Sequence, residues 1–144
     1  MRLLLALLLA FAQPVYNANP PTAVNPGDVF TLWSAETPTP GNGTTAASQQ
    51  VGLSLPSAQG KSPGFAIDGK FSGAPGAFEI DVQVAATDAD TNYQTCVAAT
   101  CQVTTVDATN NTFHVDGTLI KARYVRLLMR SRTNSVTITA TITG

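Results

Sequence analysis

Two cysteines carry the most definite chemistry of this 144-residue chain. Cys96 and Cys101 frame the segment TCVAATC. If the residues on either side pair as neighbouring strands, the two sulfur atoms face each other within disulfide reach. A metal site would need further ligands, and a redox motif normally has two intervening residues. We therefore expect a structural disulfide in an oxidising compartment and two free thiols in a reducing one.

Oxygen-bearing side chains alternate at Asp88, Asp90 and Asn92, as in the first half of a calcium loop. The glycine that such a loop needs next is replaced by Tyr93, and Ala99 stands where a bidentate glutamate belongs. Asp and Asn at this spacing are also typical of a solvated turn. The turn is the interpretation we favour, so the sequence predicts no metal and no cofactor.

His114, the single histidine, lies in the segment TFHVDG. Phe113 and Val115 occupy the opposite face of the alternating pattern, so His114 is expected to point outward beside Asp116. A catalytic triad needs a nucleophile, a base and an orienting acid, and the chain has no nucleophile-elbow motif. The two glutamates of the chain give little support to a two-carboxylate hydrolase. The sequence therefore favours a protein that is not an enzyme.

Five of the eight basic residues lie in one short segment, KARYVRLLMRSR. The alternation places Arg126 and Arg130 on the outward face of one strand. Such charges ordinarily keep an edge strand from pairing with a neighbour. They can also form a docking stripe for an acidic partner surface or a carbohydrate. The interaction candidates are Lys121, Arg123, Arg126, Arg130 and Arg132.

The elements that must position these residues show period-two alternation of apolar and polar side chains, which is the pattern of half-buried strands. The clear segments are residues 65–71, 77–85, 124–130 and 135–143. The weaker segments are residues 29–34, 49–55, 93–98, 101–106 and 112–119. In KFSGAPGAFEIDV, glycine and proline stand between two alternating runs, and this order predicts a hairpin.

Eight or nine short strands separated by Gly, Pro, Asn and Ser turns predict an all-β fold. The expected architecture is an antiparallel β-sandwich with the jelly-roll arrangement and an extended N-terminal arm. The chain length suits one such domain, which we assign to residues 28–144. Trp33, the only tryptophan, is expected in its core. Residues 1–27 combine an apolar segment with a connector rich in Pro and Asn.

The N-terminal stretch RLLLALLLAFAQ has a positive residue, an apolar run and a small-x-small exit, which together outline a secretory signal. The run is too short to span a bilayer, which takes about 20 apolar residues. Two alternatives stay open for this segment. It is either a signal cleaved near Ala12 or a retained arm whose apolar face is buried against a partner subunit.

Charged residues make up 12% of the chain, and the formal net charge is −1. Such a composition argues against nucleic-acid binding, which needs many Lys and Arg to replace phosphate counterions. A surface of Thr, Ser, Ala and Asn with so few charges suits packing against other copies of the chain. We therefore expect a homo-oligomer.

Two long segments resemble small β-sandwich virion proteins of tailed bacteriophages, over roughly residues 65–144. They are FSGAPGAFEIDVQVAATDADTNYQT and NNTFHVDGTLIKARYVRLLMRSRTNSVTITATITG. The resemblance rests on the hairpin, on the closing strand ARYVRL (residues 122–127) and on the Thr/Val-rich final strand (residues 136–143). It implies a virion location, other virion proteins as partners, and a structural role in capsid decoration or as a head or tail accessory subunit. No catalytic residue comes with it.

A weaker resemblance, carried by the same ARYVRL strand, is to galactose-binding-like jelly-roll modules. It implies a secreted carbohydrate-binding or adhesive module with a glycan as partner. In that case the signal is removed after Ala12, and Cys96 and Cys101 are oxidised. Such modules usually carry several exposed aromatic side chains in their loops, whereas this chain has one Trp and three Tyr. The virion interpretation is therefore the leading one.

Overall fold

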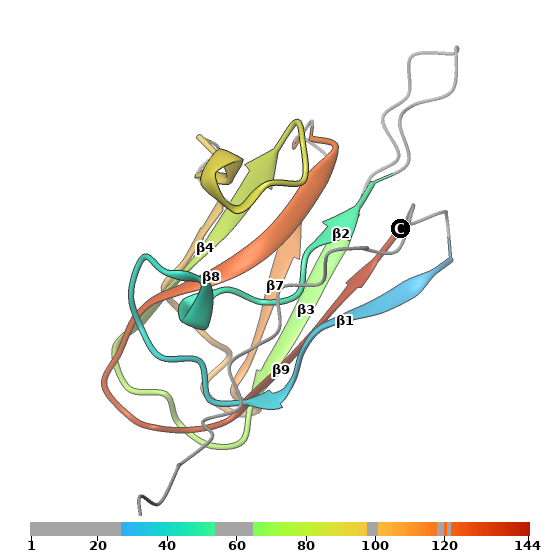
Figure 1. Cartoon of the computed structure of the whole chain (residues 1–144). Coiled ribbons are helices and arrows are strands. Elements are labelled where there is room, and N and C mark those ends of the chain that lie inside the picture. The colour runs from blue at the N-terminus through green and yellow to red at the C-terminus, as the bar shows by residue number, and fades with distance from the viewer. Residues whose placement is uncertain (1–26, 54–64, 98–100, 118–119, 121) are drawn as a thin grey trace, which may run out of the picture.

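The computed structural model describes residues 27–53, 65–97, 101–117, 120 and 122–144. Within these residues the strands form two antiparallel sheets, one of four and one of five strands, packed face to face (Figure 1). The predicted all-β sandwich is confirmed. The predicted arm and its alternative as a signal fall on residues 1–26, which lie outside the described residues.

The first sheet has the strand order β1-β9-β3-β7. Its two edge strands differ in regularity. β1 shifts register against β9 twice, around Trp33, whereas β3 and β7 pair without a shift. The strands of this sheet are β1 (Val29–Glu36), β3 (Ala66–Phe71), β7 (Thr112–Asp116) and β9 (Ile138–Thr143).

The second sheet has the order β2-β8-β4-β5, and β6 also pairs with β4. Since β8 pairs with β4 along its whole length, β5 and β6 share the other side of β4. The two short strands are therefore two halves of one edge strand. The strands of this sheet are β2 (Val51–Gly52), β4 (Phe78–Ala85), β5 (Gln94–Thr95), β6 (Gln102–Val103) and β8 (Tyr124–Arg132).

Counting β5 and β6 as one strand, the described strands follow the orders 1-8-3-6 and 2-7-4-5. These orders are the jelly-roll arrangement of two Greek keys, as predicted. The first strand therefore pairs with the last, and each sheet is assembled from segments far apart in the sequence (Figure 1).

The core lies between the sheets and takes every second residue of the long strands, except in β1, where the adjacent Leu32 and Trp33 are both buried. Val125, Leu127 and Met129 of β8 are fully buried there, as the alternation predicts. Trp33 is fully buried as well, which confirms its expected place. Opposite Phe113, β3 carries Gly69, where an added Cβ would lie 2.1 Å from the aromatic ring. The glycine thus makes room for that ring in the core.

The predicted hairpin over KFSGAPGAFEIDV is wrong. β3 and β4 belong to different sheets, and residues 72–77 carry the chain from one sheet to the other. Gly76 in this connection has a φ of +69°, so the expected turn chemistry is present. Turn residues determine where a chain bends, but they do not determine whether the flanking strands pair with each other or with distant partners.

The outer faces of the two sheets differ. Residues 41–50, which we call the covering segment, include the 3₁₀ turn η1 (Thr44–Ala46) and run beside β8 of the second sheet. Ala46 and Ala47 of this segment cover Leu128 on the outer face and form a separate buried cluster with it. The outer face of the first sheet carries exposed polar side chains such as Lys70 and Thr139. Among the described residues, no helix has the length and apolar character needed to cross a membrane.

Candidate functional site

Arg126 lies at the centre of a polar cluster on the outer face of the second sheet. Its Nε donates to Gln83 Oε1 at 2.9 Å, and its Nη1 bonds to the carboxylate of Asp90. The guanidinium also stacks on Tyr93, 4.1 Å from the ring centroid, in a cation–π contact. The Arg126 side chain is only 6% exposed, so these contacts balance its charge inside the protein.

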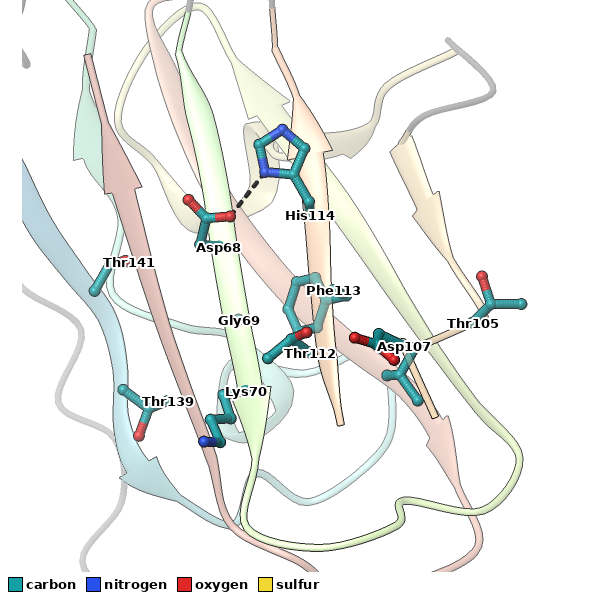
Figure 2. A pocket seen from close by; sticks show the side chains of 11 residues that line it. Asp68, Gly69, Lys70, Thr105, Asp107, Thr112, Phe113, His114, Thr139 and Thr141 are labelled. Atoms are coloured by element: carbon teal, nitrogen blue, oxygen red, sulfur yellow. Dashed lines mark hydrogen bonds and ion pairs between the residues drawn. The ribbon is translucent and has the colours of Figure 1, made fainter. Parts of the chain in front are cut away.

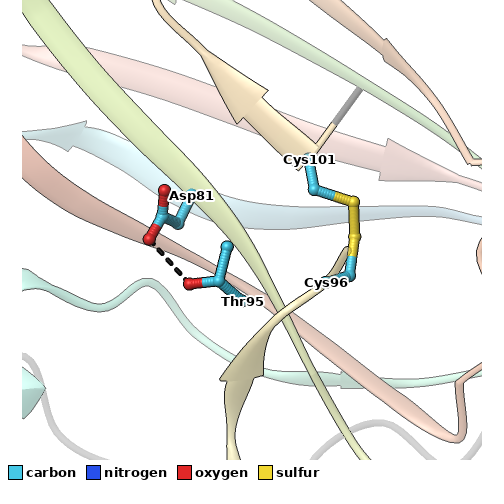
Figure 3. Close-up of a disulfide and its surroundings, with 4 residues drawn as sticks. All are labelled: Asp81, Thr95, Cys96 and Cys101. Carbon is cyan, nitrogen blue, oxygen red and sulfur yellow. Dashed lines mark hydrogen bonds between the residues drawn. A yellow bond between two sulfur atoms is a disulfide. The ribbon is translucent and has the colours of Figure 1, made fainter. Parts of the chain in front are cut away.

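Arg130 makes a second set of contacts on the same face. Its Nε donates to Asp81 Oδ2, and its Nη1 donates to Asn42 Oδ1 in the covering segment. The Thr95 hydroxyl donates to the same Asp81 oxygen at 2.7 Å (Figure 3). Asp81 is 1% exposed, so its carboxylate is a buried anchor that joins β4, β5, β8 and the covering segment.

The predicted role of Arg126 and Arg130 in edge protection is wrong, because β8 lies between β2 and β4. Arg132 donates to the Val136 carbonyl at 2.9 Å, and partial burial lowers the pKa of its guanidinium. Arg123 is exposed, 5.9 Å from the ring centroid of Tyr124. Lys121 lies outside the described residues. A docking role for this segment stays a prediction, with Arg123 as the exposed basic residue of its described part.

The three residues of the calcium candidate are held by different neighbours. Asp90 bonds to Arg126, while Asp88 Oδ1 accepts the Tyr93 hydroxyl at 3.0 Å. The Asn92 amide donates to Thr87 Oγ1. The segment is a turn that includes the 3₁₀ element η2 (Asp90–Asn92). No group of three His, Cys, Asp or Glu that could hold a metal ion occurs in the described part of the chain.

Cys96 and Cys101 are joined by a disulfide, with Cα atoms 5.7 Å apart (Figure 3). This is the bond expected in an oxidising compartment, but the predicted pairing of its flanking strands is wrong. β5 and β6 pair with β4, not with each other. The disulfide therefore joins the end of β5 to the start of β6, the two halves of one edge strand. Cys101 is fully buried, and Val97, which lies between the two cysteines in sequence, is fully exposed.

A shallow open groove of about 770 Å³ lies on the outer face of the first sheet (Figure 2). Residues of β3, β7 and β9 and the segment 105–107 line it. Its side chains include two carboxylates, one ammonium group, one imidazole and several hydroxyls. The residues with these groups are Asp68, Lys70, Thr105, Asp107, Thr112, His114, Thr139 and Thr141.

His114 pairs with Asp68, its direct cross-strand neighbour on β3, through an Nδ1 to Oδ1 distance of 2.7 Å (Figure 2). His114 is exposed on the same face of β7 as Asp116, as expected, and the neighbour to which it bonds is Asp68 on the adjacent strand. The pair supplies an imidazole oriented by a carboxylate, as in a catalytic triad. The third member, a hydroxyl bonded to Nε2, does not occur among the described residues.

Asp107 closes the turn that leads into β7. Its carboxylate accepts hydrogen bonds from the Asn110 amide and from the Thr109 backbone N–H, both at 2.8 Å. These bonds favour the ionised form and hold the pKa of Asp107 below its ordinary value. The groove therefore has a fixed negative charge at one end.

Sequence reasoning missed Asp68 as the partner of His114 and Asp81 as the anchor of Arg130. The alternation does place Asp68 and His114 on polar faces, but only the register of β3 against β7 brings them together. The alternation predicts that Asp81 faces solvent. It is buried because Thr95 and Arg130 pack against it, and the sequence does not reveal this.

Comparison of the chain with protein-family models, curated proteins and solved structures finds no match. Function must therefore be inferred from the fold and from the chemistry of these surfaces.

Proposed function

We propose that the chain is a non-enzymatic structural subunit of a bacteriophage virion. It would act as a capsid decoration protein or a head or tail accessory protein, through contacts between subunits. The observation that carries the proposal is the strand order, because viral capsid domains are a major class of jelly rolls. Since one fold serves many functions, the surfaces have to support the same conclusion.

The surfaces favour contact over catalysis. The buried or partly buried charges Arg126, Arg130 and Asp81 are engaged in ties between segments of the sandwich. The exposed face of the first sheet is polar and rich in threonine, and the chain has a net charge of only −1. Proteins with so little charge self-associate easily, which suits a subunit of a symmetric assembly.

Virus particles purified from the source culture test this function. Quantitative mass spectrometry of gradient-purified particles is expected to find the chain at a fixed ratio to the major capsid protein. The fraction that contains free protein serves as the control. Recovery of the chain only from that fraction would overturn the virion assignment.

The proposal gives the apolar segment a role as a retained arm that is buried in the particle. Burying half of such an arm contributes several kcal/mol, at about 25 cal/mol per Å² of apolar area. Deleting residues 1–12 is therefore expected to abolish incorporation into particles and to leave the sandwich folded. A control of equal length, with serine in place of the leucines between residues 3 and 9, should behave like the deletion. Normal incorporation of either variant contradicts the arm.

A second candidate is a secreted carbohydrate-binding or adhesive module. The Cys96–Cys101 disulfide favours it, because such bonds persist mainly in oxidising compartments. Lectin domains also use the jelly-roll arrangement, and the groove with Asp68 and Lys70 offers acceptors and a donor for sugar hydroxyls.

Intact mass of the native protein separates the two functions. A measured mass equal to that of a chain starting at Met1 or Arg2 supports the retained arm. Loss of the first dozen residues together with two hydrogens supports secretion and oxidation. The control is the same sample after reduction, which should gain two hydrogens only if the disulfide was present.

A further inference from the structure

The positions of the two cysteines are set by contacts that do not involve their bond. Cys96 follows β5, and its backbone N–H donates to the Val82 carbonyl of β4 at 3.0 Å. The residue before it, Thr95, pairs with Gln83 of β4 and donates its hydroxyl to buried Asp81 at 2.7 Å. These contacts hold Cys96 against β4 whether or not its sulfur is bonded.

Cys101 is held against the same strand independently. It precedes β6, whose residue Val103 pairs with Ile80 of β4. The side chains of Cys101 and Val103 belong to the core between the sheets. The Cα atoms of the two cysteines lie 5.7 Å apart, an ordinary spacing for a disulfide (Figure 3). Because β4 positions both residues, the chain with two free thiols also holds them within bonding reach.

The bond itself contributes little to defining the fold. It joins residues only five positions apart in sequence, so it restricts the unfolded chain over a short loop. The long ladder between β4 and β8 does not involve it. We therefore expect the dithiol chain to form the same sandwich.

The two cysteines differ in access from solvent. Cys101 is fully buried. Cys96 is half-buried and precedes Val97, whose side chain is fully exposed. A dissolved thiol reagent therefore reaches Cys96 first, and Cys101 reacts only within the protein.

We propose that the chain folds and enters the particle as a dithiol, and that the Cys96–Cys101 bond forms only after the particle has left the reducing cytoplasm. The timing rests on the proposed function, because a virion subunit is made among reduced thiols, whereas disulfides persist on particles outside the cell. The folded dithiol and the order of reaction rest only on the geometry of β4, β5 and β6. A disulfide is thus compatible with a virion subunit as well as with a secreted module.

The oxidant is a low-molecular-weight disulfide, for which oxidised glutathione is the probe. The Cys96 thiolate attacks one of its sulfur atoms, forms a mixed disulfide and releases one small thiolate. The Cys101 thiolate then attacks the Cys96 sulfur and expels the second small thiolate. The two leaving thiolates take up the two protons that the cysteines lose. Two protein thiols and one small disulfide thus become one protein disulfide and two small thiols.

Oxidation after assembly stabilises one edge of the second sheet. β5 and β6 have two residues each, and without the bond each can open from β4 separately. In the dithiol form the Cys96 amide, which bonds to Val82, is expected to exchange with solvent roughly tenfold faster than in the oxidised form. The control is the Phe71 amide of the first sheet, which bonds to Asn111 and should exchange at the same rate in both forms.

Reduction of the wild-type chain with dithiothreitol tests the folded precursor. The amide spectrum is expected to stay dispersed after the reductant is removed, and oxidised glutathione should restore the bond in the folded protein. A spectrum without dispersion overturns the folded dithiol. An exchange rate at Cys96 that is the same in both forms overturns the stabilisation of the edge.

Two single substitutions test the order of the reaction. Cys101→Ala leaves the half-buried thiol, and its intact mass is expected to show a stably added glutathionyl group. Cys96→Ala leaves the buried thiol and should react roughly a hundredfold more slowly while it is folded. If either variant does not fold, limited alkylation of the wild-type dithiol with iodoacetamide replaces it, and fragmentation should locate the first label on Cys96. A first label on Cys101, or equal rates for the two folded variants, overturns the order.

Acid quenching of producing cells and of released particles tests the timing. Thiols are then alkylated with iodoacetamide in urea and counted by intact mass. We expect two labels on the chain inside the cells and none on the chain in released particles. A disulfide inside the cells, or two free thiols in the particles, overturns the timing. Absence of the chain from particles overturns the virion function and the timing with it, but not the folded dithiol, which is measured on the purified protein.

Discussion

For Arg126 the sequence predicts the correct face of the strand but the wrong role. The alternation places it on the face away from the core, and the structure agrees. It is nevertheless buried, because Tyr93 and the turn that contains Asp90 fold over it. The guanidinium charge that the sequence offered as a docking group instead holds this turn against the sheet.

Replacing Arg126 with alanine is expected to lower the free energy of unfolding by about 2 kcal/mol. The substitution leaves the buried Gln83 side chain and Asp90 without their cationic partner. Breaking a fully buried pair costs more, but Asp90 is 44% exposed and water can solvate it again. Urea denaturation measures the change. Arg123→Ala is the matched control at an exposed arginine and should stay within about 0.5 kcal/mol of wild type. Equal effects of the two substitutions would contradict the internal role of Arg126.

At the scale of elements, the disulfide stabilises one edge of the second sheet. It links β5 to β6, which together form one edge strand, and it closes the loop that contains Val97. The adjacent Thr95 donates to buried Asp81 (Figure 3). Because Arg130 bonds to the same Asp81 oxygen, the ordering of β5 is linked to the Arg130 contacts. The bond therefore acts on an edge of the sheet and not on its centre.

Removing the disulfide by the double substitution Cys96→Ala and Cys101→Ala is expected to destabilise the protein by about 2 kcal/mol. The value is modest because the bond closes only a short loop. The loss should be visible as a lower thermal midpoint, and adding reductant to wild type should reproduce it. The control is Val97→Ser, a substitution of an exposed residue between the two cysteines, which should leave the thermal midpoint unchanged. No difference between oxidised and reduced protein would contradict the stabilising role.

Sequence patterns predicted the strands well because burial of one face is a local property. The run at residues 124–130 lies within β8, and the apolar residues on the face opposite to Arg126, namely Val125, Leu127 and Met129, are fully buried. Pairing depends on distant segments, and here local reasoning failed. The turn after Phe71 looked like a hairpin, yet β3 and β4 pair in different sheets. The same limit explains the partner of His114, which only the register reveals.

The whole molecule is organised by pairings that are remote in sequence. β1 pairs with β9, so the sheet is complete only when the last strand has been added. β9 also pairs with β3 along six residues, so it lies in the middle of this sheet. Folds dominated by such remote pairings form slowly, in milliseconds to seconds, and depend on all parts being present.

This topology predicts opposite results for shortening the chain at its two ends. Deleting residues 138–144 removes the fully buried Ile138, Ala140 and Ile142 and breaks both ladders of β9. Because β1 and β3 then have no strand between them, we expect the whole sandwich to be unfolded, with little dispersion of amide resonances. The control, deletion of residues 1–12, should keep a dispersed spectrum and a cooperative urea transition. A folded, cooperative protein without β9 would mean that the second sheet and its covering segment form a stable unit alone. That result would contradict the conclusion that the two sheets share one core and fold together.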